Sequence, residues 1–207
     1  MTDIWQNLAG QETAKRAIEI AMVGGLAITF IPVEGAGYSF TAYDVGQLTG
    51  ETREKAQARM DAYDGEPMSI AAAADTVLQV RAAADDLAAR CGLPALVTSR
   101  DTADMRIDIQ PVTIADFLLP PPAEPVEAVV RRVMAAVEKL PSIKNELTHE
   151  ATALLDNWTR LVPTAPVDAA IEMARCILAL GGYVSREGDG TQISRLCLAE
   201  AISYCRR

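Results

Sequence analysis

The chain has a single histidine, and its few cysteines show no metal-binding spacing. With His149 as the only imidazole, neither the usual zinc sites nor a Ser/His/Asp triad has support, because both depend on histidine. Cys91, Cys176, Cys197 and Cys205 show no CxxC spacing and fall within apparent helices. This pattern indicates small buried hydrophobic residues rather than a disulfide or a metal site.

Long apolar segments and net positive charge are also missing. The longest apolar run, residues 18–33, is interrupted by Glu19, Pro32 and two glycines, so it is too short to span a bilayer. The formal net charge of −9 repels phosphate backbones and anionic lipids, so neither nucleic acid nor a membrane surface is an expected partner. The first residues contain no basic segment of the kind that begins a secretory signal, and we expect a cytoplasmic protein.

Aromatic residues make up only 5% of the 207 residues, whereas half of the chain is hydrophobic, mostly alanine and aliphatic residues. Such a composition favours packed helices over a β-sandwich. Apolar periodicity predicts a helix-rich α/β fold. The expected helices are residues 11–22, 51–63, 69–91, 126–140, 148–161, 167–180 and 193–205, and the expected strands are 26–33, 93–98 and 105–110.

The helix predicted for residues 69–91 carries apolar residues at alternating intervals of three and four, including Val77, Val80, Ala84 and Leu87. This seam predicts a face packed against the protein core, with a dimer seam as the alternative. Prolines 120–122 and 125 then mark a boundary, because consecutive prolines cannot continue a helix. We therefore predict an α/β core over residues 1–119, a Pro-rich linker over 120–125 and a helical domain over 126–207.

Residues 28–39, ITFIPVEGAGYS, have parts of a phosphate-binding loop. Such a loop needs a buried strand and a glycine-rich turn whose N–H groups hold phosphates. It also needs a lysine for the β/γ-phosphates and a hydroxyl for magnesium. The segment supplies the strand, Gly35, Gly37 and the hydroxyl of Ser39, but alone this is a weak signal.

The residues around this segment strengthen it. Gly10-Gln11-Glu12, followed by AKRAIEIA over residues 14–21 and by Gly24-Gly25, resembles the N-terminal helix of magnesium-chelatase-type AAA+ ATPases, at the spacing that this family uses before its P-loop. Residues 100–109 and 113–117 resemble a later strand and helix of the family. Residues 147–151, 174–177 and 199–204 resemble its C-terminal lid helices. The resemblance implies an eroded P-loop, AAA+-like core with a small β-sheet and a C-terminal helical, lid-like domain.

The departures from the family pattern fall on its chemistry. Pro32 stands where the first glycine of GPPGSGKT belongs, Tyr38 replaces the lysine, and Glu34 adds a negative charge. A tyrosine cannot supply the point charge that lysine gives to a transferring phosphoryl group. The acidic Walker B strand is missing between residues 44 and 100, and Ala165 stands at the position of the sensor arginine. The resemblance is thus to a truncated, degenerate member, and ATP hydrolysis is not expected.

The glycine-rich segment keeps two interpretations. As a loop, Gly35, Ala36, Gly37, Tyr38 and Ser39 would hold a nucleotide or another anion without hydrolysis, with ATP or ADP as the ligand. As a β-hairpin over residues 32–43, the segment would have no phosphate cradle at all. No catalytic residue and no metal ligand is assigned.

Other polar and aromatic residues receive structural interpretations. Trp5 and Trp158 are predicted to anchor the core rather than to form a binding surface. Lys15 and Arg16 fit the solvated face of a helix, with contact to a ligand phosphate as the alternative. Asp104 and Asp108 fit the solvent side of a strand better than a metal site.

The loss of chemistry, with the packing helices still recognisable, suggests a non-catalytic, AAA+-like interaction or regulatory protein. The expected partner is another protein, either an active AAA+ subunit or a second copy of the chain. Residual nucleotide or anion binding is the alternative function.

Overall fold

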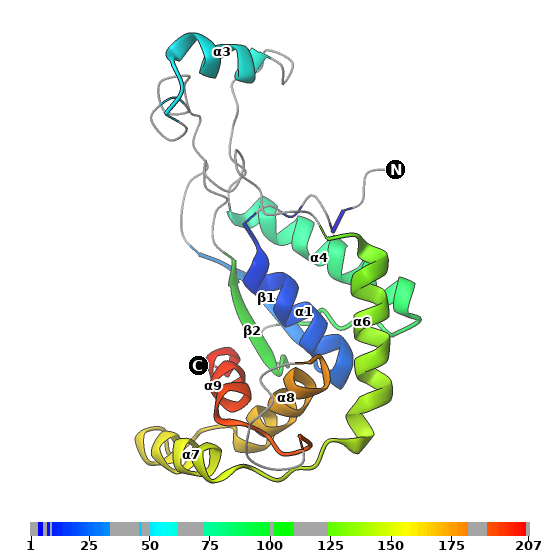
Figure 1. Cartoon of the computed structure of the whole chain (residues 1–207), viewed down its shortest axis with the longest axis vertical. Coiled ribbons are helices and arrows are strands. Elements are labelled where there is room, and N and C mark those ends of the chain that lie inside the picture. Colours follow the sequence, from blue (N-terminus) through cyan, green and yellow to red (C-terminus); the bar gives the residue numbers. More distant parts are fainter. Residues whose placement is uncertain are drawn as a thin grey trace.

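The structure is a computed structural model, and it describes residues 4–5, 8, 10–33, 46, 50–61, 73–99, 102–109, 124–181 and 190–205. Within these residues it is rich in helix and contains one small parallel sheet, as the sequence predicts for an α/β fold (Figure 1). The chain forms α1, β1, α3, α4, β2, α6, α7, α8 and α9 in this order, with a short 3-10 helix, η1, between α6 and α7.

A short glycine turn joins the first helix to the first strand. α1 spans Glu12–Gly24, and its buried residues, such as Ile18 and Ile20, belong to the core. Gly25 ends the helix with a φ of 62°, a left-handed conformation that glycine adopts without steric cost. β1 follows at Ile28–Pro32. Because this turn is short, the chain reverses its direction between α1 and β1. The start of α1 therefore lies at the same end of the molecule as the end of β1.

The sheet pairs β1 with β2, Met105–Ile109, in parallel, and Phe30 lies opposite Ile107. Parallel neighbours need a long crossover connection, and here that connection contains α3, Arg53–Asp61, and α4, Ala73–Cys91. On β2, Met105, Ile107 and Ile109 are buried while Asp108 is exposed, the alternation typical of a strand covered on one face.

The periodic seam of α4 faces the core, as predicted. Val80 and Leu87 are fully buried, and α4 packs against β1, α1 and α6. Leu78, on the opposite side of the helix, is exposed. α3 is mostly polar and lies apart from the other helices, at the far end of the molecule from α7 (Figure 1).

Four helices make up the C-terminal part: α6, Val126–Lys139; α7, His149–Leu161; α8, Val167–Ala179; and α9, Arg195–Tyr204. The hydroxyl oxygen of Thr148 accepts a hydrogen bond from the backbone N–H of Ala151 and caps α7, and Ser194 caps α9 in the same way. Such caps stabilise a helix by about 1 kcal/mol. η1, Leu140–Ser142, links α6 to the turn before α7.

The C-terminal helices share one hydrophobic core with the N-terminal part. α8 and α6 both pack against α1, and α9 also contacts β2. The central residues of α8, including Met173 and Ile177, have no exposed surface. The predicted Pro-rich linker at residues 120–125 stays a prediction, because residues 120–123 lie outside the described residues.

The predicted strand over residues 93–98 is wrong. Only Val97 pairs with Ile28, as an isolated bridge on the edge of β1 that β2 does not occupy, and most of the segment is exposed or half-buried. Pro94 has no backbone N–H to donate to a neighbouring strand, which favours an irregular path. Among the described helices, none has the length and apolar character needed to cross a membrane.

Candidate functional site

The predicted nucleotide-binding residues, Gly35, Ala36, Gly37, Tyr38 and Ser39, lie outside the described residues, as does most of the alternative hairpin. Their role stays a prediction. The structure describes β1 up to this segment, and the N–H of Val33 still donates to the carbonyl of Ile109, 3.0 Å away. The pairing of β1 with β2 thus continues to the residue before the predicted loop.

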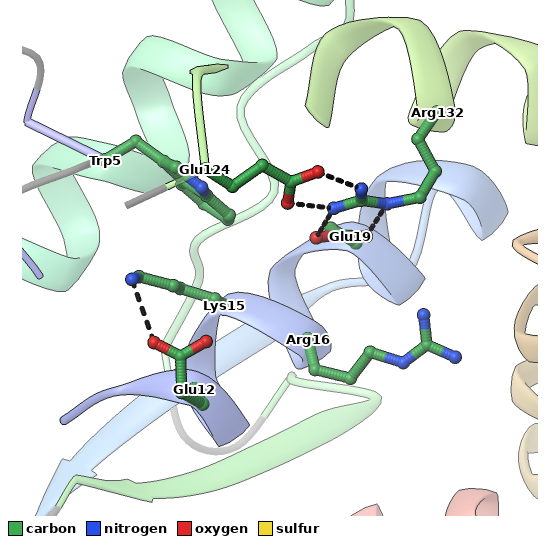
Figure 2. A pocket seen from close by; sticks show the side chains of 7 residues that line it. All are labelled: Trp5, Glu12, Lys15, Arg16, Glu19, Glu124 and Arg132. Atoms are coloured by element: carbon green, nitrogen blue, oxygen red, sulfur yellow. Dashed lines mark hydrogen bonds and ion pairs between the residues drawn. The ribbon is translucent and has the colours of Figure 1, made fainter. Parts of the chain in front are cut away.

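A cavity of about 240 Å³ lies beside α1 and is lined almost entirely by charged side chains (Figure 2). One face of α1 supplies four of them, at positions three and four residues apart, which share a helix face. Trp5 comes from the N-terminal segment, one residue comes from the middle of α6 and one from just before this helix. The lining residues are Trp5, Glu12, Lys15, Arg16, Glu19, Glu124 and Arg132.

Arg132 occupies the centre of a three-residue cluster and binds two carboxylates at once. Its Nε and one terminal nitrogen donate to Glu19 at 2.9 and 2.7 Å. Both terminal nitrogens donate to Glu124, the longer contact being 2.8 Å. The Glu19 side chain is only 7% exposed, whereas that of Arg132 is 34% exposed. The planar guanidinium fork suits such paired contacts, and this Arg132 cluster fastens α6 to α1.

Arg132 and Glu124 shift each other's pKa. Hydrogen bonds from Arg132 hold the pKa of Glu124 below its ordinary value. The two carboxylates raise the pKa of Arg132, first through the bonds to Glu124 and then through those to Glu19. Arg132 therefore stays charged, and Glu124 stays ionised to lower pH than a free glutamate.

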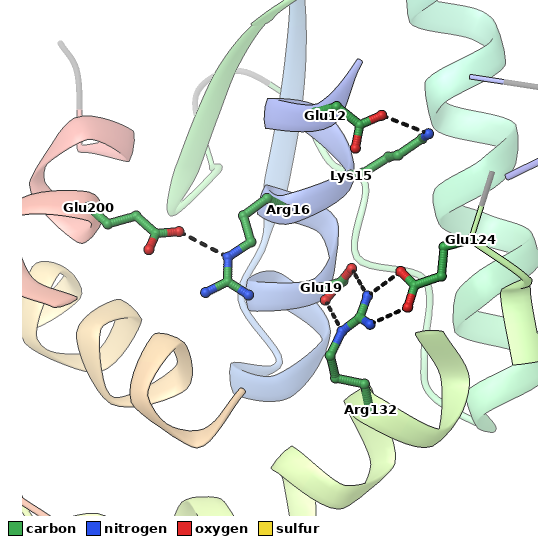
Figure 3. Close-up of polar contacts among 7 residues, drawn as sticks. All are labelled: Glu12, Lys15, Arg16, Glu19, Glu124, Arg132 and Glu200. Atoms are coloured by element: carbon green, nitrogen blue, oxygen red, sulfur yellow. Dashed lines mark hydrogen bonds and ion pairs between the residues drawn. The ribbon is translucent and has the colours of Figure 1, made fainter. Parts of the chain in front are cut away.

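The two cations that the sequence suggested as alternative phosphate contacts are also paired (Figure 3). Lys15 donates to Glu12 at 3.0 Å, one turn away on α1. Arg16 points in another direction, and its Nε donates to Glu200 of α9, also at 3.0 Å. The side chain of Arg16 is half-buried, so it is not simply solvated as the sequence suggested. It joins two helices.

Other residues weighed from the sequence have structural partners. The Asp104 carboxylate accepts a hydrogen bond from the N–H of Ala27 at 2.8 Å and so holds the start of β1. Trp5 is buried, which confirms it as a core anchor, whereas Trp158 is half-buried against the core. In the part of the chain that the structure describes, His, Cys, Asp and Glu residues form no group of three that could hold a metal ion.

The four cysteines form no disulfide. Cys91, Cys176 and Cys197 are buried, as the sequence predicts, whereas Cys205 is half-buried. Burial raises the pKa of Cys176 to about 12 and that of Cys205 to about 11. These thiols are poor nucleophiles at neutral pH, because the thiolate is the reactive form.

The sequence did not reveal the Arg132 cluster. In the sequence Arg132 is one of two adjacent arginines, and its carboxylate partners lie 8 and 113 residues away. One indication of a charged site was present in the sequence, because the spacing of Glu12, Lys15 and Glu19 places them on a single face of α1. No protein-family model, curated protein or solved structure matches the chain.

Proposed function

We propose that the chain is a non-catalytic, AAA+-like interaction or regulatory protein that contacts an active AAA+ subunit or a second copy of itself. The observation that carries this proposal is the ion pair between Arg16 and Glu200. These residues come from the two ends of the chain that resemble the family, its N-terminal helix and its closing helix. Their pairing supports a shared ancestral packing in which the cations of α1 bind carboxylates of the protein.

The surface of the C-terminal helices supports a protein partner. Ala151 is the only fully buried residue of α7, while Leu154, Leu155 and Trp158 are half-buried. Leu161, at the end of α7, is 80% exposed, and Leu196, near the start of α9, is 56% exposed. Leu154, Leu155 and Trp158 pack partly against the core, so Leu161 and Leu196 are the leucines of these two helices that are exposed to a partner. We place the partner contact on this α7–α9 surface.

The proposal is tested by affinity capture from native cells together with sedimentation of the purified chain. The wild-type protein is expected to retain an AAA+ subunit or to self-associate. A Leu161→Gln/Leu196→Gln double variant is expected to lose that association while keeping its fold. Ala153→Gln, an exposed change elsewhere on α7, is the matched control. A wild-type chain that sediments as a monomer and retains no AAA+ subunit would contradict the proposal.

Residual nucleotide binding by Gly35–Ser39 is a separate alternative, favoured by the strand that leads directly into this segment. Calorimetric titration with magnesium-ATP and with ADP tests it. Micromolar binding that a Ser39→Ala variant weakens would support the loop interpretation, and the absence of heat at millimolar nucleotide would rule it out. Turnover of ATP above that of a Tyr38 or Ser39 variant would show that hydrolysis survives.

A further inference from the structure

β2 is an edge strand within the part of the chain that the structure describes, because β1 is its single neighbour in the sheet. The N–H of Met105 donates to a carbonyl just before β1, and the carbonyl of Ile109 accepts from the residue just after β1. The odd-numbered residues of β2 thus turn their backbone groups toward β1. Because this direction alternates along a strand, the N–H and C=O groups of Arg106 and Asp108 point away from β1. They have no hydrogen-bond partner among the described residues.

A cavity of about 300 Å³ borders this edge, where the start of α1, the middle of β2 and the end of α9 meet. Three consecutive residues of β2, Arg106, Ile107 and Asp108, contribute to its lining. Side chains of consecutive residues alternate between the two faces of a sheet, so a space that all three reach lies along the edge of the strand. The unpaired backbone groups therefore adjoin open space. An edge of this kind is a template for pairing with another strand.

The sequence of β2, MRIDI, is complementary to itself when two copies run antiparallel about a two-fold axis at Ile107. Arg106 then lies opposite Asp108 of the second copy, and the same pair repeats on the other side of the axis. The apolar residues match as well, since Ile107 meets its own copy and Met105 meets Ile109. Opposite charges on directly opposed residues stabilise a pair of strands. The charge pattern therefore favours a second copy of this chain as the occupant of the edge.

The backbone groups select the same register. In an antiparallel pair, two directly opposed residues can exchange both of their N–H···O bonds, and Arg106 and Asp108 are the residues of β2 that offer these groups on the open edge. Opposing Arg106 to Asp108 of the second copy satisfies the groups of both residues. The other registers that use these groups oppose Arg106 to Arg106 or Asp108 to Asp108, and like charges directly opposite each other are unfavourable.

We infer that β2 pairs edge to edge with β2 of a second copy of the chain, antiparallel and about a two-fold axis, so that the sheet continues across a dimer. The pairing goes beyond the proposed function, because none of its residues belongs to the α7–α9 surface. It holds whether or not that surface binds an AAA+ subunit.

The first test is sedimentation equilibrium of the full chain over a concentration series up to millimolar, in which the wild type should show a monomer–dimer equilibrium. Asp108→Arg places arginines opposite each other on both sides of the axis and should weaken the dimer by at least about tenfold. Arg106→Asp should have the same effect through opposed aspartates. Asp85→Arg, the same charge reversal at an exposed position of α4, is the control and should dimerise as the wild type does.

Mixing the two reversed variants gives a readout that a structural effect would not produce. Asp108→Arg and Arg106→Asp should each be monomeric alone, but together they should form a heterodimer, because the arginines of one chain then oppose the aspartates of the other. Circular dichroism checks the fold of each variant. If Arg106→Asp does not fold, Asp108→Asn replaces it, and this neutral change at an exposed position should weaken the dimer less than Asp108→Arg does.

A wild type that stays monomeric at millimolar concentration, or a dimer that Asp108→Arg leaves as strong as that of the wild type, would overturn the inference. Self-association that is lost in Leu161→Gln/Leu196→Gln but kept in Asp108→Arg would also overturn it. That last result would assign the contact between copies to the α7–α9 surface and would uphold the proposed function.

Discussion

Arg16 and Glu200 stand 184 residues apart in the sequence, yet their side chains meet at 3.0 Å and join α1 to α9. Arg132 makes a corresponding link from α6 to α1. α1 is therefore held on two sides by charge pairs and on its buried side by α8 and the sheet. The predictions below address this central helix, its neighbours and the buried thiols.

Arg132→Met should lower the free energy of unfolding by about 1–3 kcal/mol, because it leaves the buried Glu19 carboxylate without its partner. Urea denaturation measures the change. Arg131→Met, at an exposed neighbouring position, should change stability by less than about 0.5 kcal/mol. A second substitution, Glu19→Leu, should recover part of the loss, since it removes the unpaired charge. Equal stability of Arg132→Met and wild type would show that the Arg132 cluster does not fasten α6.

Acid should weaken the contact between Glu124 and Arg132. The pKa of Glu124 lies below its ordinary value in the folded protein, so its contribution is present above the pKa of the unfolded state, about 4.5, and is lost as pH falls through the lower, folded value. The wild type should therefore be more stable than Glu124→Gln at neutral pH, and the difference should shrink at acid pH. Thermal melts of the two proteins across this range measure it. A difference that stays constant with pH would contradict the assignment.

Substitution of either glycine at the end of α1 should lower the stability of the protein, for a different reason at each position. A Cβ at Gly24 would approach Sγ of Cys176 to 2.7 Å and Cγ of Leu26 to 2.9 Å, so Gly24→Ala should destabilise by about 1–3 kcal/mol through overpacking. Gly25 has open space around it but a left-handed backbone, so Gly25→Ala should cost about 1 kcal/mol.

Chemical denaturation of both glycine variants gives the values. Cys176→Ala should relieve part of the cost of Gly24→Ala and none of the cost of Gly25→Ala. Equal rescue of both would refute the steric explanation, because the sulfur atom lies near Gly24 alone.

The thiols should react slowly in the native protein. Burial raises the pKa of Cys91, Cys176, Cys197 and Cys205, so little thiolate is present near neutral pH. A disulfide reagent should label them quickly only after denaturant is added. Cys205 is the most accessible of the four and should react first. Fast labelling of a Cys205→Ser variant without denaturant would contradict the buried placement of the other three.

The sequence predicted most helices and both paired strands to within a few residues, because each has a strong apolar period and a clear end. Gly25 and Gly92 end α1 and α4 in left-handed conformations, and Thr148 caps α7. The apolar content of residues 93–98 favoured a strand, but Pro94 limits backbone pairing, and the segment forms only one isolated bridge to β1. The Arg132 cluster was beyond prediction, because Glu19 and Arg132 meet only after α6 has packed on α1. Within the described residues the buried Nε of Arg106 has no hydrogen-bond partner, and the sequence could not show this, because it depends on which acceptors the fold places nearby.

The packing of α1 against α8 has a consequence during protein synthesis. α1 ends at Gly24 and α8 begins at Val167, about 140 residues later, so the ribosome makes the apolar face of α1 long before its cover. At typical elongation rates this delay is on the order of ten seconds. Contacts between such distant segments also slow folding itself. The part of α1 that α8 covers thus stays exposed on the nascent chain until α8 emerges, and we expect it to bind chaperones that recognise apolar segments in the meantime.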